Sequence, residues 1–211
     1  LTVPGLIIRC CRPVETFNFL RLRTIVVAGS VVCNIVIVLH EQTVRNIITG
    51  GDAIPLVTGN NEWTALTTPG YCWFNNDETT YKNPYGALYN WFAVNNGNLC
   101  PVGWHVPTHP EWTRLTDFLG GIYVAGAELK EEGLGHWLSP NTGATNRTLF
   151  TAIGGGARNF NGAFMQFGVY GNWWTSSLDV PGWAWYRYIA FNDIYVGVNH
   201  YNQPAGMSAG A

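Results

Sequence analysis

Two patterns in the sequence have the spacing of catalytic or metal-binding motifs. The segment 206–210, Gly-Met-Ser-Ala-Gly, has the Gly-x-Ser-x-Gly spacing of a hydrolase nucleophile elbow. That motif needs a helix after the serine and a histidine later in the chain, whereas the sequence ends at Ala211. His105 and His109 lie four residues apart, but Pro107 and Pro110 interrupt any helix that would place both on one face. We therefore expect neither a serine nucleophile nor a histidine metal pair.

Cysteine spacing points away from a structural metal as well. The chain has five cysteines, with no Cys-x-x-Cys pair and no Cys/His group at zinc spacing. They are Cys10, Cys11, Cys33, Cys72 and Cys100. In an oxidising compartment the adjacent Cys10 and Cys11 could bond two distant partners, and the sequence leaves that connectivity open. We predict no metal and no cofactor.

An aromatic cluster in the last third of the chain is the strongest functional signal. Its members are Trp173, Trp174, Trp183, Trp185, Tyr186 and Tyr188. One interpretation is core packing, and we expect Trp173 and Trp185 in the core. Because Tyr and Trp with Asn and Ser are also typical of recognition surfaces, the exposed members are candidates for a binding face.

Composition limits the class of protein. Charged residues make up 11% of the 211 residues, against about 25% in an average soluble domain, while aromatic residues reach 14% and glycine numbers 25. This favours a single-core, loop-rich, β-containing extracellular protein over a cytosolic helical enzyme. The net charge is −2 without a basic stripe, so we expect no nucleic-acid partner.

The first 50 residues differ from the rest in being rich in Val, Ile and Arg. The apolar run 25–39 contains Gly29, Ser30 and Asn34 and is shorter than the roughly 20 residues of a membrane span, so we expect no membrane span. A signal peptide is the next alternative, but the run starts late and the chain begins with Leu1, so we expect a mature or processed chain. The β-branched residues predict strands at 24–28 and 31–39. Such apolar strands need cover from the domain or from a neighbouring subunit, which suggests a homo-oligomer or filament.

Local signals predict three helices and a hairpin. Thr108 and Glu111 form a capping box for a helix that ends at Gly120-Gly121, with Trp112, Leu115 and Leu119 on its buried face. Asn83-Pro84 predicts a second helix over 85–94, and a third is expected over 124–132. The runs 184–191 and 194–201 predict two strands joined by a tight turn at Asn192-Asp193. In the second run Ile194, Val196 and Val198 alternate with Tyr195, Asn199 and Tyr201, which gives one core face and one polar-aromatic face.

Residues 51–206 resemble the Fibrobacter succinogenes major paralogous domain family. The matching segments are 53–57 (AIPLV), 69–77 (PGYCWFNND), 85–91 (YGALYNW), 99–108 (LCPVGWHVPT), 139–146 (SPNTGATN) and 170–177 (YGNWWTSS). The resemblance implies an α+β, C-type-lectin-like fold, shared with formylglycine-generating enzymes and carried by secreted or surface-anchored bacterial proteins. It also implies a relation to retroelement variable proteins, whose C-terminal hairpin presents ligand-binding residues.

By position in that hairpin, the resemblance implies a ligand-binding set. The set is Asn172, Asp179, Trp183, Tyr186, Tyr188, Asn192, Tyr195, Asn199, Tyr201 and Asn202. The family's closing cysteine falls on Ala211, so we expect Cys100 to lack that partner. Formylglycine-type catalysis needs a reactive cysteine pair near the C-terminal core, and no cysteine follows Cys100, so we expect no enzyme.

Together these observations predict an N-terminal β-rich segment, 1–50, that serves in assembly or anchoring, and a C-type-lectin-like domain, 51–211. Short helices should surround small twisted antiparallel sheets. The predicted function is a secreted or cell-surface ligand-binding or adhesion module whose partner is a glycan or a protein. The alternative is a structural subunit of an extracellular filament or surface assembly, built through the N-terminal strands. A formylglycine-generating-like enzyme comes third.

Overall fold

The computed structural model describes residues 7–13, 36–42, 53–97, 99–100 and 105–209. Within the first 50 residues, β1 (Ile7–Pro13) pairs in parallel with β2 (Val36–Gln42), with Ile7 opposite Val36. The predicted strand 24–28 lies outside the described residues. The predicted strand 31–39 overlaps β2 from residue 36 onward, whereas the sequence analysis did not predict β1.

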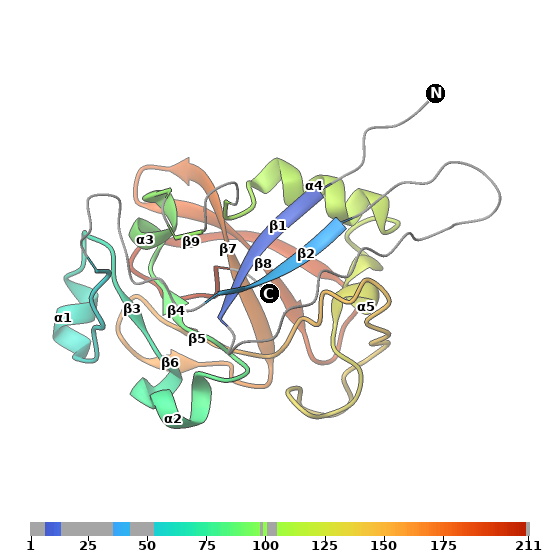
Figure 1. Ribbon diagram of the computed structural model, residues 1–211, viewed down its shortest axis with the longest axis horizontal. Coiled ribbons are helices and arrows are strands. Elements are labelled where there is room, and N and C mark those ends of the chain that lie inside the picture. The colour runs from blue at the N-terminus through green and yellow to red at the C-terminus, as the bar shows by residue number, and fades with distance from the viewer. Residues whose placement is uncertain (1–6, 14–35, 43–52, 98, 101–104, 210–211) are drawn as a thin grey trace.

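The rest of the described chain combines short helices with small antiparallel sheets, so the α+β class is confirmed. The helices are α1 (Asn60–Thr64), the 3-10 helix η1 (Phe74–Asn76), α2 (Glu78–Tyr81), α3 (Trp91–Asn95), α4 (His109–Phe118) and α5 (Ala125–Leu129). The strands are β3 (Tyr71–Cys72), β4 (Leu88–Tyr89), β5 (Ala157–Arg158), β6 (Phe164–Met165), β7 (Tyr170–Val180), β8 (Trp183–Ala190) and β9 (Val196–Asn202). Pairing gives the two-stranded sheets β3-β4 and β5-β6 and the three-stranded sheet β7-β8-β9. In Figure 1 this larger sheet crosses the middle of the molecule, with α1 and α2 toward one end and α5 toward the other.

Helix α4 forms where its sequence predicts. The Thr108 hydroxyl accepts the Glu111 amide at 3.3 Å, and the Glu111 carboxylate accepts the Thr108 amide at 2.8 Å, which completes the capping box. Trp112 and Leu115 are buried on the inner face. The helix ends at Phe118, and Gly120 follows with a φ of 97°, a value that glycine adopts without strain.

The predicted helix over 85–94 is wrong. Gly86 has a φ of 75°, and the next residues form β4, which pairs with β3. The helix begins only at α3, because the Asn90 side chain caps it by accepting the Ala93 amide at 3.0 Å. A later and stronger cap, together with pairing to a distant strand, outweighs the Asn83-Pro84 signal.

The third predicted helix, 124–132, is shorter than expected. Helix α5 ends at Leu129, because Lys130 takes up an extended conformation and bridges in parallel to Ala152. The residues beyond Lys130 form a loop rather than the last helical turn.

Core packing covers both sides of the three-stranded sheet. On one side Trp173, Ile189 and Val196 pack with Trp112 and Leu115 of α4. On the other side Trp174 and Ala184 pack in a cluster with Trp91 of α3 and Met207. Trp173 is thus in the core, as predicted, whereas Trp185 is only partly buried, so that prediction is wrong.

The structure assigns states to two of the cysteines. Cys72 is a buried free thiol, and burial raises its pKa to about 12. Cys100 is disulfide-bonded, so the missing closing cysteine does not leave it without a partner. In the described part of the chain, no helix has the length and apolar character needed to cross a membrane.

Candidate functional site: the tyrosine face of the C-terminal sheet

Alternation along β8 separates two kinds of side chain. Arg187 and Ile189 are buried on the α4 side of the sheet, so Tyr186 and Tyr188 point to the other side. Strand register adds residues of β9 to that second side, since Tyr186 lies opposite Asn199 and Ala184 opposite Tyr201. The side chains gathered there are five half-exposed tyrosines and one exposed asparagine, and we call them the tyrosine face: Tyr170, Tyr186, Tyr188, Tyr195, Tyr201 and Asn199.

Tyr188 lies flat on the sheet because its partner across the strands is glycine. A Cβ placed on Gly197 would lie 2.0, 2.1 and 2.4 Å from three adjacent atoms of the Tyr188 ring. Three such similar distances mean that the Cβ would run into the face of the ring rather than its edge. One face of Tyr188 therefore covers Gly197, and the other is turned away from the sheet.

The rings of the tyrosine face form a central pair with inclined rings beside it. The ring centroids of Tyr186 and Tyr188 are 5.9 Å apart, and the two ring planes are tilted by 35°, so the pair forms a bent aromatic surface. Tyr170 and Tyr195 flank Tyr188 at 5.7 and 6.2 Å, with their rings at 69° and 75° to it. Tyr201 flanks Tyr186 at 6.1 Å and 71°. Two central rings, tilted by 35° from each other, are thus bordered by three steeply inclined ones.

Two loops extend this surface. Tyr123 is 75% exposed and stacks on Tyr195 at 5.7 Å, whereas Phe160 is 44% exposed and contacts Tyr201 at 6.0 Å. The sequence analysis missed both, because nothing near them in sequence links them to β9. It also missed Tyr170, although its position two residues before Asn172 could have placed it on the same side of β7.

Burial raises the pKa of three hydroxyls of the tyrosine face. It raises the pKa of Tyr186 to about 12, and the tyrosines around Tyr186 add to the shift. Burial also raises the pKa of Tyr188 and of Tyr201 above the usual tyrosine range. The Tyr201 hydroxyl donates to Asn159 at 3.0 Å. At neutral pH these residues offer hydroxyl groups and ring faces without charge.

Three members of the predicted ligand-binding set lie elsewhere on the sheet. Asp179 bonds to His200, and the His200 ring lies 5.2 Å from the Trp183 ring. Asp179 and Trp183 therefore lie on the α4 side, together with His200 and Trp185. Asn202 lies opposite Trp183 in the register. Asp179 belongs to the predicted set by its position in the hairpin of the resembling family, whereas alternation along β7 from the buried Trp173 already indicates the α4 side.

Asn172 is a clearer correction. It is only 5% exposed, and its side-chain amide donates to the Gly156 carbonyl at 3.2 Å. It lies opposite Tyr188 and supports the sheet from within rather than presenting a contact surface. The remaining predicted residue, Asn192, is exposed in the connection between β8 and β9.

The β8–β9 connection is longer than the predicted two-residue turn. It spans 191–195, and Asn192 and Asp193 do not have positive φ angles. Lys130 explains its course, since the buried ammonium donates to the carbonyls of Thr142, Ala190 and Asp193 at 2.8, 3.2 and 2.8 Å. Burial lowers the pKa of Lys130 to about 8. Lys130 is thus a positioning residue that holds the connection leading into Tyr195.

The two motifs with chemical spacing do not form sites. His105 Nε2 pairs with the Glu111 carboxylate at 2.9 Å, whereas the His109 ring stacks on Trp185 at 4.7 Å, so the imidazoles serve different contacts. Ser208 lies in a bridge beside Trp173, not at a strand-to-helix turn. Among the described residues, no group of three His, Cys, Asp or Glu side chains could hold a metal ion.

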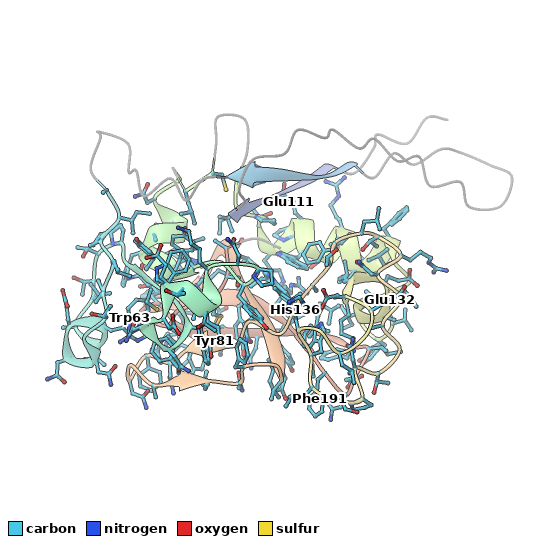
Figure 2. The ribbon with its side chains drawn as sticks, turned by 60° about the horizontal axis from the view of Figure 1, so that its bottom comes forward. Trp63, Tyr81, Glu111, Glu132, His136 and Phe191 are labelled. Atoms are coloured by element: carbon cyan, nitrogen blue, oxygen red, sulfur yellow. The ribbon has the colours of Figure 1, made fainter. Side chains whose placement is uncertain are left out.

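A second aromatic cluster lies away from the tyrosine face. His136 pairs with Glu131 at 2.8 Å and packs edge-on against Tyr85, which contacts Tyr81 and Phe167. Figure 2 shows Tyr81 and His136 near the middle of the view, with Phe191, where the β8–β9 connection starts, at its lower edge. Tyr81 and Phe167 pack against a buried core cluster, so we assign this group a structural role.

The described fold is an α+β domain whose C-terminal sheet presents an uncharged aromatic face. Residues 40–208 match the Fibrobacter succinogenes major domain, and the chain belongs to this family. No curated protein matches the chain, and no solved structure does either. The C-type-lectin-like relation and the division at residue 50 therefore stay predictions.

Proposed function

We propose that this chain is a non-enzymatic ligand-binding or adhesion module at a bacterial cell surface, and that the tyrosine face makes the contact. The observation that supports this most is the pair of half-exposed rings of Tyr186 and Tyr188, which three further tyrosines border. The Tyr188 ring lies over Gly197. Rigid aromatic side chains provide contact area at a low cost in conformational entropy. Aromatic rings held on the strands of a sheet, rather than on loops, form a preorganised surface that suits recognition.

A second candidate function is that of a structural subunit, and the pairing of β1 with β2 favours it. The two strands form a parallel two-stranded sheet. A sheet of two strands is marginal by itself, so further strands from a neighbouring copy would stabilise it. Light scattering on the purified chain separates the candidates, because concentration-dependent fibres support the subunit and a discrete monomer counts against it.

The binding function is tested with fluorescently labelled chain and intact cells of a mixed bacterial culture. Replacing both Tyr186 and Tyr188 by Ser should weaken cell binding by at least tenfold, since central aromatic contacts contribute about 2 kcal/mol or more each. Trp183→Ala is the matched control, because Trp183 is a 37% exposed aromatic on the opposite side of the same sheet. Equal binding by all three proteins, with unchanged circular dichroism, would contradict the proposal.

A further inference from the structure

The three-stranded sheet sorts its side chains by charge. The acidic, basic and imidazole residues of β7, β8 and β9 are Asp179, Arg187 and His200, and all three lie on the α4 side. Arg187 is 1% exposed and donates to the His109 carbonyl and the Thr113 hydroxyl of α4. Among the described residues of these strands, the tyrosine face thus holds only uncharged side chains.

A carboxylate of the β8–β9 connection, that of Asp193, borders the tyrosine face. Asp193 accepts the backbone amides of Ile194 and Tyr195 at 2.6 and 3.1 Å. Its charge adds to the rise in the pKa of Tyr188, after burial and the neighbouring tyrosines. Asp193 therefore places a negative charge at the border of the tyrosine face, which disfavours an anionic ligand there.

This pattern excludes anionic ligands. Single-stranded nucleic acids also stack on aromatic side chains, but they need a basic groove that follows the phosphates. Acidic peptides and anionic headgroups need a complementary positive charge, because desolvation of an unpaired charge is costly. An uncharged ligand with hydroxyl groups and apolar ring faces meets neither obstacle.

Polar groups on the tyrosine face complement such a ligand. Asn199 is exposed beside Tyr186, and its side-chain oxygen accepts the His200 amide at 2.8 Å, which leaves the NH₂ group to donate outward. The Tyr201 hydroxyl donates to Asn159 and keeps its acceptor capacity. One amide donor and one hydroxyl acceptor thus lie beside the two central rings.

We propose, on the basis of the binding function above, that the tyrosine face binds an uncharged oligosaccharide. The apolar C–H faces of two consecutive sugar rings stack on Tyr186 and Tyr188, whose centroids are 5.9 Å apart. The inclined rings of Tyr170, Tyr195 and Tyr201 border the two stacked sugars. The hydroxyls of the sugars bond to Asn199 and Tyr201.

Affinity gel electrophoresis tests this ligand class directly. The full chain is run through native gels containing mixed-linkage β-glucan, galactomannan or dextran, and through gels containing alginate or heparin. We expect retardation by at least one neutral polymer and none by the charged polymers. Retardation by alginate or heparin alone, or by no neutral polymer, would overturn the inference.

Variants locate the binding. Tyr188→Ala should weaken retardation by at least tenfold, Tyr188→Phe should keep most of it because the ring remains, and Trp183→Ala should leave it unchanged. Retardation that survives Tyr188→Ala would place the ligand elsewhere and overturn the inference. If no neutral polymer binds while cell binding still depends on Tyr186 and Tyr188, the proposed function stands and its ligand is a protein.

Discussion

Gly197 controls the position of Tyr188, and Gly197→Ala tests that control. The new Cβ would lie 2.0 to 2.4 Å from three ring atoms of Tyr188, well inside van der Waals contact. The ring must therefore lift off the sheet by more than an ångström or turn away. Either movement removes the flat surface that we assign to ligand stacking.

The structure sets the size of the effect. Forcing an extra carbon into a packed position typically costs about 1–3 kcal/mol. Replacing glycine by alanine returns about 0.4–1 kcal/mol by restricting the unfolded chain. We expect the free energy of unfolding to fall by about 1–2 kcal/mol, as the difference between these terms.

Urea unfolding of four proteins measures this effect: the wild type, Gly197→Ala, Tyr188→Ala and the double variant. Because the collision is with the Tyr188 ring, Gly197→Ala should cost little or nothing once Tyr188 is alanine. Gly155→Ala is the matched control, since Gly155 is also buried but its Cβ would have no atom nearer than 3.9 Å. An equal loss from Gly197→Ala in both backgrounds would refute the reasoning.

Three further variants test the supporting structure. In the wild type the free energy of unfolding should rise between about pH 8 and 10.5, because over that range the unfolded chain holds a Lys130 proton that the folded chain has lost. Lys130→Met should abolish this rise, which pH-dependent urea unfolding measures. The free energy of unfolding of the wild type should fall between about pH 10 and 12, because folded Tyr186 keeps the proton that the unfolded chain loses. Tyr186→Phe should reduce this fall, and an equal dependence of unfolding free energy on pH in both proteins would contradict the prediction. Thr108→Ala should lower the melting temperature through a loss of about 0.5–2 kcal/mol, whereas Thr64→Ala, at an exposed site, should not.

Features set by near neighbours in the sequence could be predicted. The capping box of α4 depends on Thr108 and Glu111, and the alternation in β8 and β9 depends on residues two apart. Both form as the sequence indicates, and they place Tyr186, Tyr188 and Tyr201 on one side of the sheet.

Features that depend on distant contacts could not be predicted. The Lys130 ammonium binds carbonyls from two segments, around Thr142 and over 190–193, that no local pattern links to Lys130. Tyr123 and Phe160 reach the tyrosine face from loops far from β9 in sequence. The helix expected over 85–94 failed for the same reason, because pairing between β3 and β4 competes with the local signal.

The most direct test of the tyrosine face is an NMR titration of the full chain carrying ¹³C-labelled Tyr and Trp rings. The ligand is an oligosaccharide fragment of whichever neutral polymer retards the chain, and Tyr→Phe variants assign the signals. We expect the ring signals of Tyr186 and Tyr188 to shift together with a single dissociation constant, while those of Trp183 and Trp185 stay in place. Shifts at Trp183 and Trp185 with unmoved tyrosines would contradict the account.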